Sequence, residues 1–127
     1  GRCLCAVPRR RLEVRAGEVS KAVTVRSVAL QKLASSLCAA LPGAYGTLNV
    51  QVFVDPQSGD LRIIEINPRF GGGYPLSWRA GAHFPRWILE ELLGLPSTVR
   101  PDDWKEGLVM LRFDDAVFVD AAAAGLQ

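Results

Sequence analysis

The most regular apolar pattern in the chain follows Ser27. Leucine, alanine and cysteine residues recur there at steps of three and four, a spacing that places them on one side of a helix. These positions are Leu30, Leu33, Ala34, Leu37, Cys38 and Leu41. Ser27 is a favourable N-cap, and Pro42-Gly43 cannot continue a helix. The pattern predicts one amphipathic helix that begins after Ser27 and ends before Pro42.

A different pattern, with a period of two, follows this helix. Aliphatic residues at 48, 50, 52 and 54 alternate with other residues, and a second strand-like segment covers 61–67. The residues between them, 55–60, are typical of a turn, so the two segments are predicted to form an antiparallel hairpin. With the turn centred on Ser58, the cross-strand pairs are Asn49 with Asn67, Gln51 with Glu65, and Phe53 with Ile63.

The remaining segments complete an α+β fold. Strands are expected at 3–7, 10–15 and 22–26, and two helical pieces within 76–93, separated near Gly81 and Pro85. A closing hairpin is expected from 108–113 and 116–119 around Asp114-Asp115. We therefore expect a single domain over residues 1–127, built as an antiparallel sheet with helices packed on one face.

Composition narrows the class of protein. The 127 residues are 49% hydrophobic and 22% charged, as in ordinary soluble domains, and no apolar run is long enough to cross a bilayer. The N-terminus has no signal-peptide pattern, so we expect a cytoplasmic protein without a membrane partner. A net charge of +2 is too small to indicate a nucleic-acid partner.

Basic residues cluster near the N-terminus, and two interpretations of them stay open. The cluster comprises Arg9, Arg10, Arg11, Arg15 and Lys21. It is either the solvated edge of a strand or a supply of positive charge for a ligand that carries several phosphates.

The polar side of the predicted hairpin is the best candidate for chemistry. Directly opposed side chains on a sheet lie about 4.5 to 5.5 Å apart, so Gln51, Glu65 and Asn67 could share one or two cations. With a single histidine and no CxxC motif, a metal should be held by oxygen atoms, which favours magnesium. The alternative interpretation is that Glu65 and its polar neighbours are simply the solvent-facing side of a sheet. Apolar residues on both faces weaken it, because polar side chains in a buried hairpin need partners.

The residues around this patch resemble a known signature. Asn-Val-Gln-Val52, the hairpin, and Glu-Ile-Asn-Pro-Arg69 resemble the ATP-grasp superfamily, and in form the synthetase domains of the carbamoyl-phosphate synthase large chain. The resemblance implies that Gln51, Glu65 and Asn67 hold magnesium, or manganese, against the phosphates of ATP. It also implies a catalytic Arg69 beside the acyl-phosphate site, the alternative being a surface arginine. Gly71-Gly72-Gly73 is either a close approach to substrate or a flexible connection.

A second segment of the resemblance lies upstream. Glu13-Val-Arg-Ala-Gly-Glu-Val-Ser20 resembles the family segment that contacts the nucleotide, which makes Val14, Arg15 and Lys21 nucleotide-binding candidates. Arg15 stands where the carbamoyl-phosphate synthases carry a histidine. An arginine could contact phosphate or ribose but could not shuttle a proton. A solvated lysine is the alternative for Lys21.

The resemblance implies that residues 1–127 are the C-terminal part of an ATP-grasp domain. The family's N-terminal lobe carries an adenine pocket, a lysine and a glycine-rich flap, none of which is found here, and that lobe of the same enzyme is the implied partner. The implied reaction uses ATP to activate a small carboxylate, or bicarbonate, as an acyl phosphate, and we expect the chain to be inactive alone. An amino-acid or peptide-forming ligase and a non-catalytic nucleotide-binding module are the alternatives.

Overall fold

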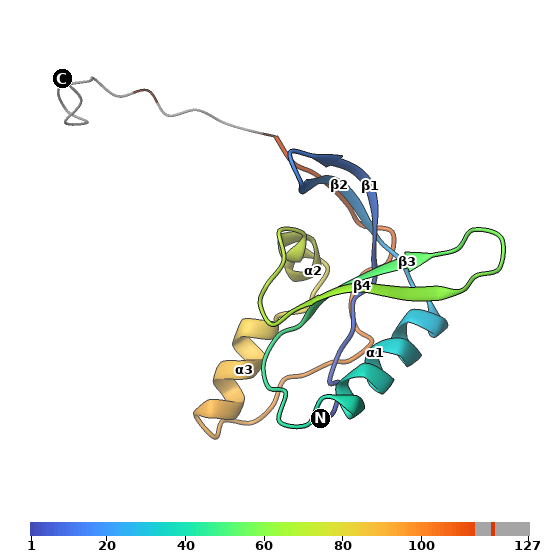
Figure 1. Ribbon diagram of the computed structural model, residues 1–127. Coiled ribbons are helices and arrows are strands. Elements are labelled where there is room, and N and C mark those ends of the chain that lie inside the picture. Colours follow the sequence, from blue (N-terminus) through green and yellow to red (C-terminus); the bar gives the residue numbers. More distant parts are fainter. Residues whose placement is uncertain (114–117, 119–127) are drawn as a thin grey trace, which may run out of the picture.

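The computed structural model describes residues 1–113 and 118. Its elements in chain order are β1 (Arg9–Arg15), β2 (Glu18–Thr24), α1 (Val28–Ala40), β3 (Asn49–Val54), β4 (Leu61–Asn67), α2 (Tyr74–Arg79), α3 (Phe84–Leu92) and β5 (Val109–Leu111). Every strand pair is antiparallel, which confirms the α+β class. The strands form two sheets and not one, with the orders β1-β2-β5 and β3-β4. Figure 1 shows the β1-β2 hairpin above the β3-β4 hairpin, and α1 and α3 below it.

Several predicted element bounds need correction. Residues 3–7 form no strand, since no ladder partner pairs with them, and the Cys5 thiol donates to the carbonyl of Pro101 at 3.2 Å. The third strand is β2, which starts at Glu18 and not at residue 22. Of the predicted closing hairpin, β5 pairs with β2, while the positions 114–117 and 119 lie outside the described residues.

The predicted helices are present. Ser27 caps α1, because its side-chain oxygen accepts a hydrogen bond from the Leu30 amide at 3.3 Å. None of the residues of α1 is fully buried by the described part of the chain, so its apolar stripe is only partly covered there. The later helical segment is divided into α2 and α3, and Gly81 between them has a φ of +111°, a conformation that favours glycine.

The turn of the β3-β4 hairpin is held by Asp55. Its carboxylate accepts hydrogen bonds from the amides of Gln57 at 2.8 Å and Ser58 at 3.0 Å, and these bonds hold its pKa below the ordinary value. Gly59 has a φ of +78°, which the reversal of the chain requires. The turn therefore forms where the sequence predicted it.

The register of this hairpin agrees with the prediction at one end only. Asn49 pairs with Asn67 and Gln51 with Glu65, as predicted, but Val52 then pairs with Ile63. Ile64 is the extra residue of a β-bulge, which shifts all later pairs by one position. The predicted pairing of Phe53 with Ile63 is therefore wrong, because periodicity alone does not show a bulge.

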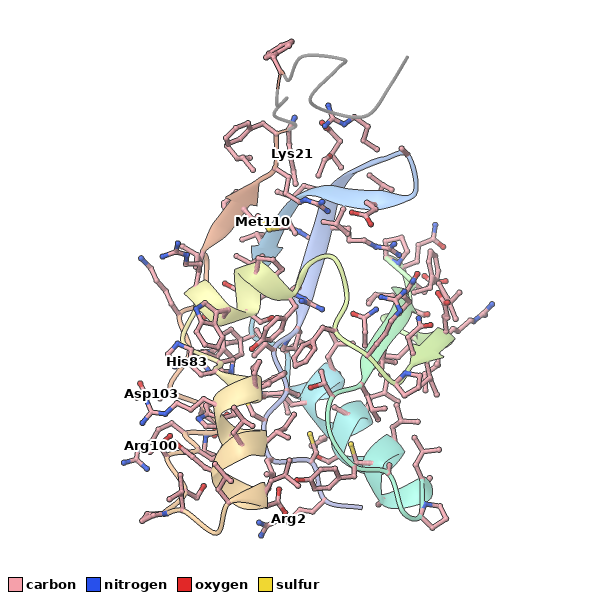
Figure 2. The ribbon with its side chains drawn as sticks, turned by 90° about the vertical axis from the view of Figure 1, so that its left-hand side faces the viewer. Arg2, Lys21, His83, Arg100, Asp103 and Met110 are labelled. Carbon is pink, nitrogen blue, oxygen red and sulfur yellow. The ribbon has the colours of Figure 1, made fainter. Side chains whose placement is uncertain are left out.

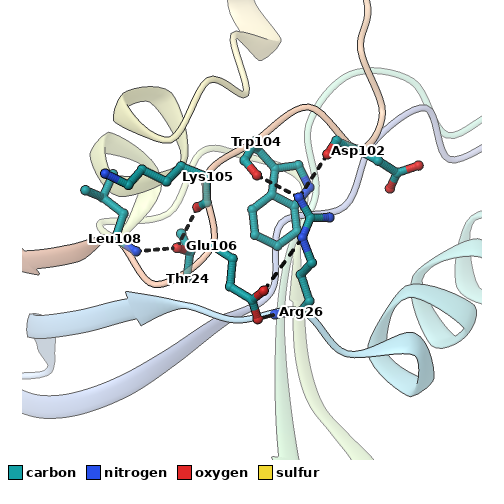
Figure 3. Close-up of polar contacts among 7 residues, drawn as sticks. All are labelled: Thr24, Arg26, Asp102, Trp104, Lys105, Glu106 and Leu108. Atoms are coloured by element: carbon teal, nitrogen blue, oxygen red, sulfur yellow. Dashed lines mark hydrogen bonds and ion pairs between the residues drawn. The ribbon is translucent and has the colours of Figure 1, made fainter.

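The segment before β5 is attached to the first sheet by polar contacts (Figure 3). The Thr24 hydroxyl donates to the carbonyl of Lys105 at 2.8 Å and accepts from the amide of Leu108 at 3.0 Å. The Arg26 guanidinium lies 4.3 Å from the centre of the Trp104 ring and donates to the Trp104 carbonyl at 2.8 Å. Thr24 and Trp104 are both buried, so these contacts fix β5 beside β2.

Glu90 of α3 holds the chain that follows this helix. Its buried carboxylate accepts from the Thr98 amide at 2.8 Å, from the Thr98 hydroxyl at 2.7 Å and from Arg86 at 2.8 Å. The bonds from Thr98, and then the one from Arg86, lower the pKa of Glu90. The carboxylate therefore stabilises the fold at pH values above the ordinary carboxyl pKa. This stabilisation is lost as the pH falls through the lowered pKa that Glu90 has in the folded protein.

We expect Glu90→Gln to lower the melting temperature at neutral pH. The difference from the wild type should shrink as the medium is acidified below about pH 4, where the wild-type carboxyl becomes neutral too. Thermal melts at a series of pH values test this, with the exposed neighbour Glu91→Gln as the control. A melting-temperature difference that stays constant from neutral to acidic pH would contradict the assignment.

The core of the described chain is small. Its buried apolar residues are Ala22, Leu76, Ala80, Ala82, Trp87 and Trp104, and α2 lies against β2 at its centre. Within the described ranges, no helix has both the length and the apolar character that crossing a membrane would require.

Candidate functional site

Two polar side chains of the β3-β4 hairpin meet directly. The amide nitrogen Nε2 of Gln51 donates to Oε2 of Glu65 at 2.6 Å, so both side chains project from the same face. They are cross-strand partners, and the Ile64 bulge lies between this pair and the hairpin turn. The bulge therefore does not disturb the part of the ladder on which the two side chains depend.

The next pair along the same face is Asn49 and Asn67. Their backbones are opposite each other, and each lies two residues from a member of the first pair, which a β-pleat places on the same side. The nitrogen Nδ2 of Asn67 is buried without a hydrogen-bond partner. A buried amide group without a partner normally signals an interaction that the chain alone does not supply.

Arg69 follows β4 at the end of this face. Its side chain is exposed, and Nη1 donates to the carbonyl of Phe70 at 3.0 Å, which uses one of the five N–H groups of the guanidinium. The backbone amide of Arg69 donates to the carbonyl of Asn67 at 2.8 Å, which turns the chain sharply after β4. Within the described residues, the other N–H groups of the guanidinium have no acceptor.

The glycine turn, residues Gly71–Gly73, packs closely against side chains from other elements. A β-carbon at Gly71 would lie 2.4 Å from Oδ1 of Asn49, closer than any real contact. At Gly73 a β-carbon would lie 3.4 Å from Nη1 of Arg9, and at Gly72 it would lie 3.5 Å from Nη1 of Arg112, both ordinary contacts. This close packing argues against the flexible connection, whereas the close approach to a substrate stays a prediction.

The upstream candidates lie on the other sheet. Val14 and Arg15 are exposed residues at the end of β1, and Lys21 is exposed on β2 (Figure 2). Nζ of Lys21 forms an ion pair with Oε2 of Glu13 at 2.6 Å, and Glu13 also accepts from Ser20. The hydrogen bond from Lys21, and then that from Ser20, lower the pKa of Glu13. The structure therefore divides the predicted site residues into two groups, one on each sheet.

The burial expected for the hairpin is wrong. Phe53 is 50% exposed and Ile64 61% exposed, and the Glu65 side chain between the isoleucines is exposed too. Both faces of the hairpin carry apolar side chains, which are exposed toward the turn, whereas residues 49–52 and Asn67 at the other end are half-buried. Glu65 is therefore open to solvent, and burial does not by itself require a ligand there.

The polar face suits a metal ion that also binds phosphate. Within the described residues, no three or more His, Cys, Asp or Glu side chains gather into a metal-binding group, so a cage made by protein carboxylates is absent there. Gln51 and Asn67 instead offer amide oxygens beside the single carboxylate of Glu65. Rotation of the Gln51 amide would present Oε1 where Nε2 now lies 2.6 Å from Glu65. Magnesium commonly binds through one or two carboxylates and completes its shell with phosphate oxygens and water.

Two residues near the glycine turn were not singled out by sequence reasoning. Arg112, just after β5, donates to Glu18 at 2.7 Å and to the carbonyl of Val19 at 3.2 Å. Arg9 donates to Ser77 at 3.2 Å and to Asn49 at 3.1 Å. The basic cluster contained Arg9, but nothing in its spacing distinguished this arginine from Arg10 or Arg11. No sequence signal indicated Arg112.

Residues 1–116 match the family described as ATP-grasp in the biosynthetic pathway with Ter operon. None of the curated proteins compared with the chain matches it. Membership of such a family indicates an ATP-binding function of the ligase type. The match covers most of the 127 residues, so the chain belongs to the ATP-grasp family.

Proposed function

We propose that this chain supplies the metal-holding, C-terminal part of the active site of an ATP-grasp ligase that activates a carboxylate, or bicarbonate, as an acyl phosphate. The observation that carries the proposal is the 2.6 Å contact between Gln51 and Glu65, in a register that also pairs Asn49 with Asn67. The carbamoyl-phosphate synthase-like form of the Glu65–Arg69 segment supports this reaction class.

Each residue of the hairpin has a distinct part in the proposed site. Gln51, Glu65 and Asn67 would hold magnesium between the hairpin and the phosphates of ATP. Magnesium, when bound, neutralises phosphate charge and orients the transferring group. Glu65 provides the one negative charge among the three ligands. The two amides add oxygen ligands without adding negative charge that would repel the phosphates.

Arg69 would act on the transferring phosphoryl group. A guanidinium presents N–H groups in a planar fork that matches phosphoryl oxygens, and it stays charged at any physiological pH. The γ-phosphoryl group passes from ATP to a carboxylate oxygen of the substrate, which leaves ADP and an acyl phosphate. An amine or another nucleophile then attacks the acyl carbon and expels phosphate. Stabilisation of charge during the transfer is the main contribution of Arg69.

A second lobe would complete the site. By the resemblance, the adenine pocket, a lysine and a flap over the phosphates belong to the N-terminal lobe of the same enzyme. We propose that Val14, Arg15 and Lys21 contact the nucleotide from the first sheet, where the ion pair with Glu13 holds Lys21 in place. Closure of such a flap would exclude water from the acyl phosphate.

Paramagnetic broadening tests the proposed metal face without requiring turnover. We expect Mn²⁺, added with ATP to the 127-residue chain, to broaden the amide resonances of residues 49–51 and 65–67 first, because these lie nearest the proposed ligands. Glu65→Gln should remove the selective broadening. Asp60→Asn, which removes an exposed carboxylate from the same hairpin, should not. Broadening centred on Asp102 and Asp103 in both the wild type and Glu65→Gln would contradict the proposal.

A further inference from the structure

The guanidinium of Arg9 lies in an unusual electrostatic position. Nη1 donates to the Ser77 hydroxyl at 3.2 Å and Nη2 to Oδ1 of Asn49 at 3.1 Å, so both of its partners are neutral. Ser77 is only 2% exposed, and burial lowers the pKa of Arg9. Three of the five guanidinium N–H groups have no acceptor within the described residues.

The carboxylates of the described chain do not neutralise Arg9. Within residues 1–113, each ion pair joins a carboxylate to another cation: Glu13 to Lys21, Glu18 to Arg112, Glu90 to Arg86, and Glu106 to Arg26. A partly buried charge without a counter-charge is costly, and most such groups are paired. Arg9 therefore has the electrostatic character of a receptor for an anion.

Arg9 borders a large cavity between the helices and the β3-β4 hairpin. The cavity measures about 870 Å³, within the range of small-molecule sites. Its apolar walls include Leu30, Leu33, Leu37, Val50, Val52 and Trp87. The cavity is also lined by three polar residues, Arg9, Asn49 and Ser77. Hydrogen bonds from Arg9 to the other two hold these polar groups together at one place in the otherwise aliphatic wall. Gln51 and Glu65 do not line it, so this site is distinct from the proposed metal face.

We propose that the cavity binds a small carboxylic acid with an apolar body, whose carboxylate is received by Arg9 and by the amide group of Asn49. The charge of Arg9 selects an anion, and the planar guanidinium matches the two oxygens of a carboxylate. The leucine and valine walls select an aliphatic or aromatic body over a polar one. The acid contacts the same asparagine that lies two residues from Gln51 on β3.

This placement deepens the proposed function. It rests on that function only for the statement that the acid bound in the cavity is the acid that is activated. Asn49 lies two residues from Gln51 on the same face of β3, a separation of about 7 Å, whereas Val50 and Val52 of the cavity wall lie on the opposite face. The carboxylate end of the acid, held at Asn49, is therefore the part that lies within reach of the phosphoryl group. Substrate choice would then lie in the cavity, and phosphoryl transfer at Gln51, Glu65 and Arg69.

Sodium hexanoate is the probe that tests the acid site, in the absence of ATP and of divalent metal. We expect it to bind the 127-residue chain saturably in calorimetry at fixed ionic strength. Hexylamine, with the same chain and the opposite charge, should not bind. Arg9→Met should weaken hexanoate binding at least about tenfold, since a charge-assisted hydrogen-bonded pair is lost. Arg62→Met, an exposed arginine of β4 outside the cavity, should bind as the wild type does.

Arg10→Met provides the sharper comparison, because Arg10 is exposed but also borders the cavity. Weaker binding in Arg10→Met with unchanged binding in Arg9→Met would overturn the proposal. Hexylamine that binds as tightly as hexanoate would overturn it too.

If Arg9→Met does not fold, the guanidinium Nε–H resonance of Arg9 in the wild type gives the answer. It should shift with hexanoate and not with sodium chloride, and an unshifted resonance would overturn the proposal. Neither readout depends on Glu65, so failure here and failure of the metal test are distinguishable.

Discussion

Glu65→Gln should abolish most of the magnesium-dependent turnover of the complete enzyme while leaving its fold intact. The substitution keeps the shape of the side chain and removes the negative charge that holds the cation against water. Even partners that only orient metal ligands typically contribute about 10- to 100-fold, so we expect a loss of at least about 100-fold for a direct ligand. Because Glu65 is exposed and its contact is to the neutral Gln51, the melting temperature should change little.

Turnover and melting temperature must be measured together on the same protein. Asp60→Asn is the matched control, since it also removes one exposed carboxylate from the β3-β4 hairpin but not from the polar face. A structural role for Glu65 predicts the opposite pattern, with lower stability and turnover preserved in the folded fraction. Unchanged turnover in Glu65→Gln would remove the metal role that we propose for it.

Gly71→Ala should destabilise the domain by about 1–3 kcal/mol, as overpacking typically does. Its β-carbon would lie 2.4 Å from Oδ1 of Asn49, and Asn49 cannot move away freely because Arg9 donates to that oxygen at 3.1 Å. Gly72→Ala should cost far less, because its nearest contact would be 3.5 Å, at the end of the Arg112 side chain. Chemical denaturation of the two variants measures the difference.

A double-mutant cycle identifies the cause of the Gly71 effect. If the added methyl collides with the Asn49 side chain, Asn49→Ala should relieve part of the cost, so that the double variant is more stable than the sum of the single effects predicts. Strictly additive effects would mean that the collision with Asn49 is not the source. Equal stabilities of Gly71→Ala and Gly72→Ala would contradict the close packing of the glycine turn.

Local patterns in the sequence predicted the parts of the fold that depend on neighbouring residues. The helix after Ser27, the Asp55–Gly59 turn and the pairing of Gln51 with Glu65 all follow from periodicity and turn chemistry, and all are present. The family was recognisable for the same reason, because its signature residues lie within one hairpin and the loop that follows it.

The features that the sequence did not predict depend on contacts between distant segments. The bulge at Ile64 comes from the fit of two strands and not from either strand's own pattern. Arg9 donates hydrogen bonds to Asn49, which is 40 positions away in the sequence, and to Ser77, which is 68 positions away. Its neutral surroundings therefore form only when β1, β3 and α2 come together. The split into two sheets likewise depends on long-range pairing, since β5 pairs with β2 while β3 and β4 pair only with each other.

The bulge at Ile64 has a consequence for how this hairpin can vary in evolution. It lies between the Asp55–Gly59 turn and the Gln51–Glu65 pair, so the ladder changes register before it reaches the polar residues. Lengthening or shortening the turn alters the outer pairs, and a bulge can absorb a one-residue offset before it spreads inward. We therefore expect insertions at the hairpin tip, and even new surface loops there, to leave the spacing of the Gln51 and Glu65 side chains unchanged.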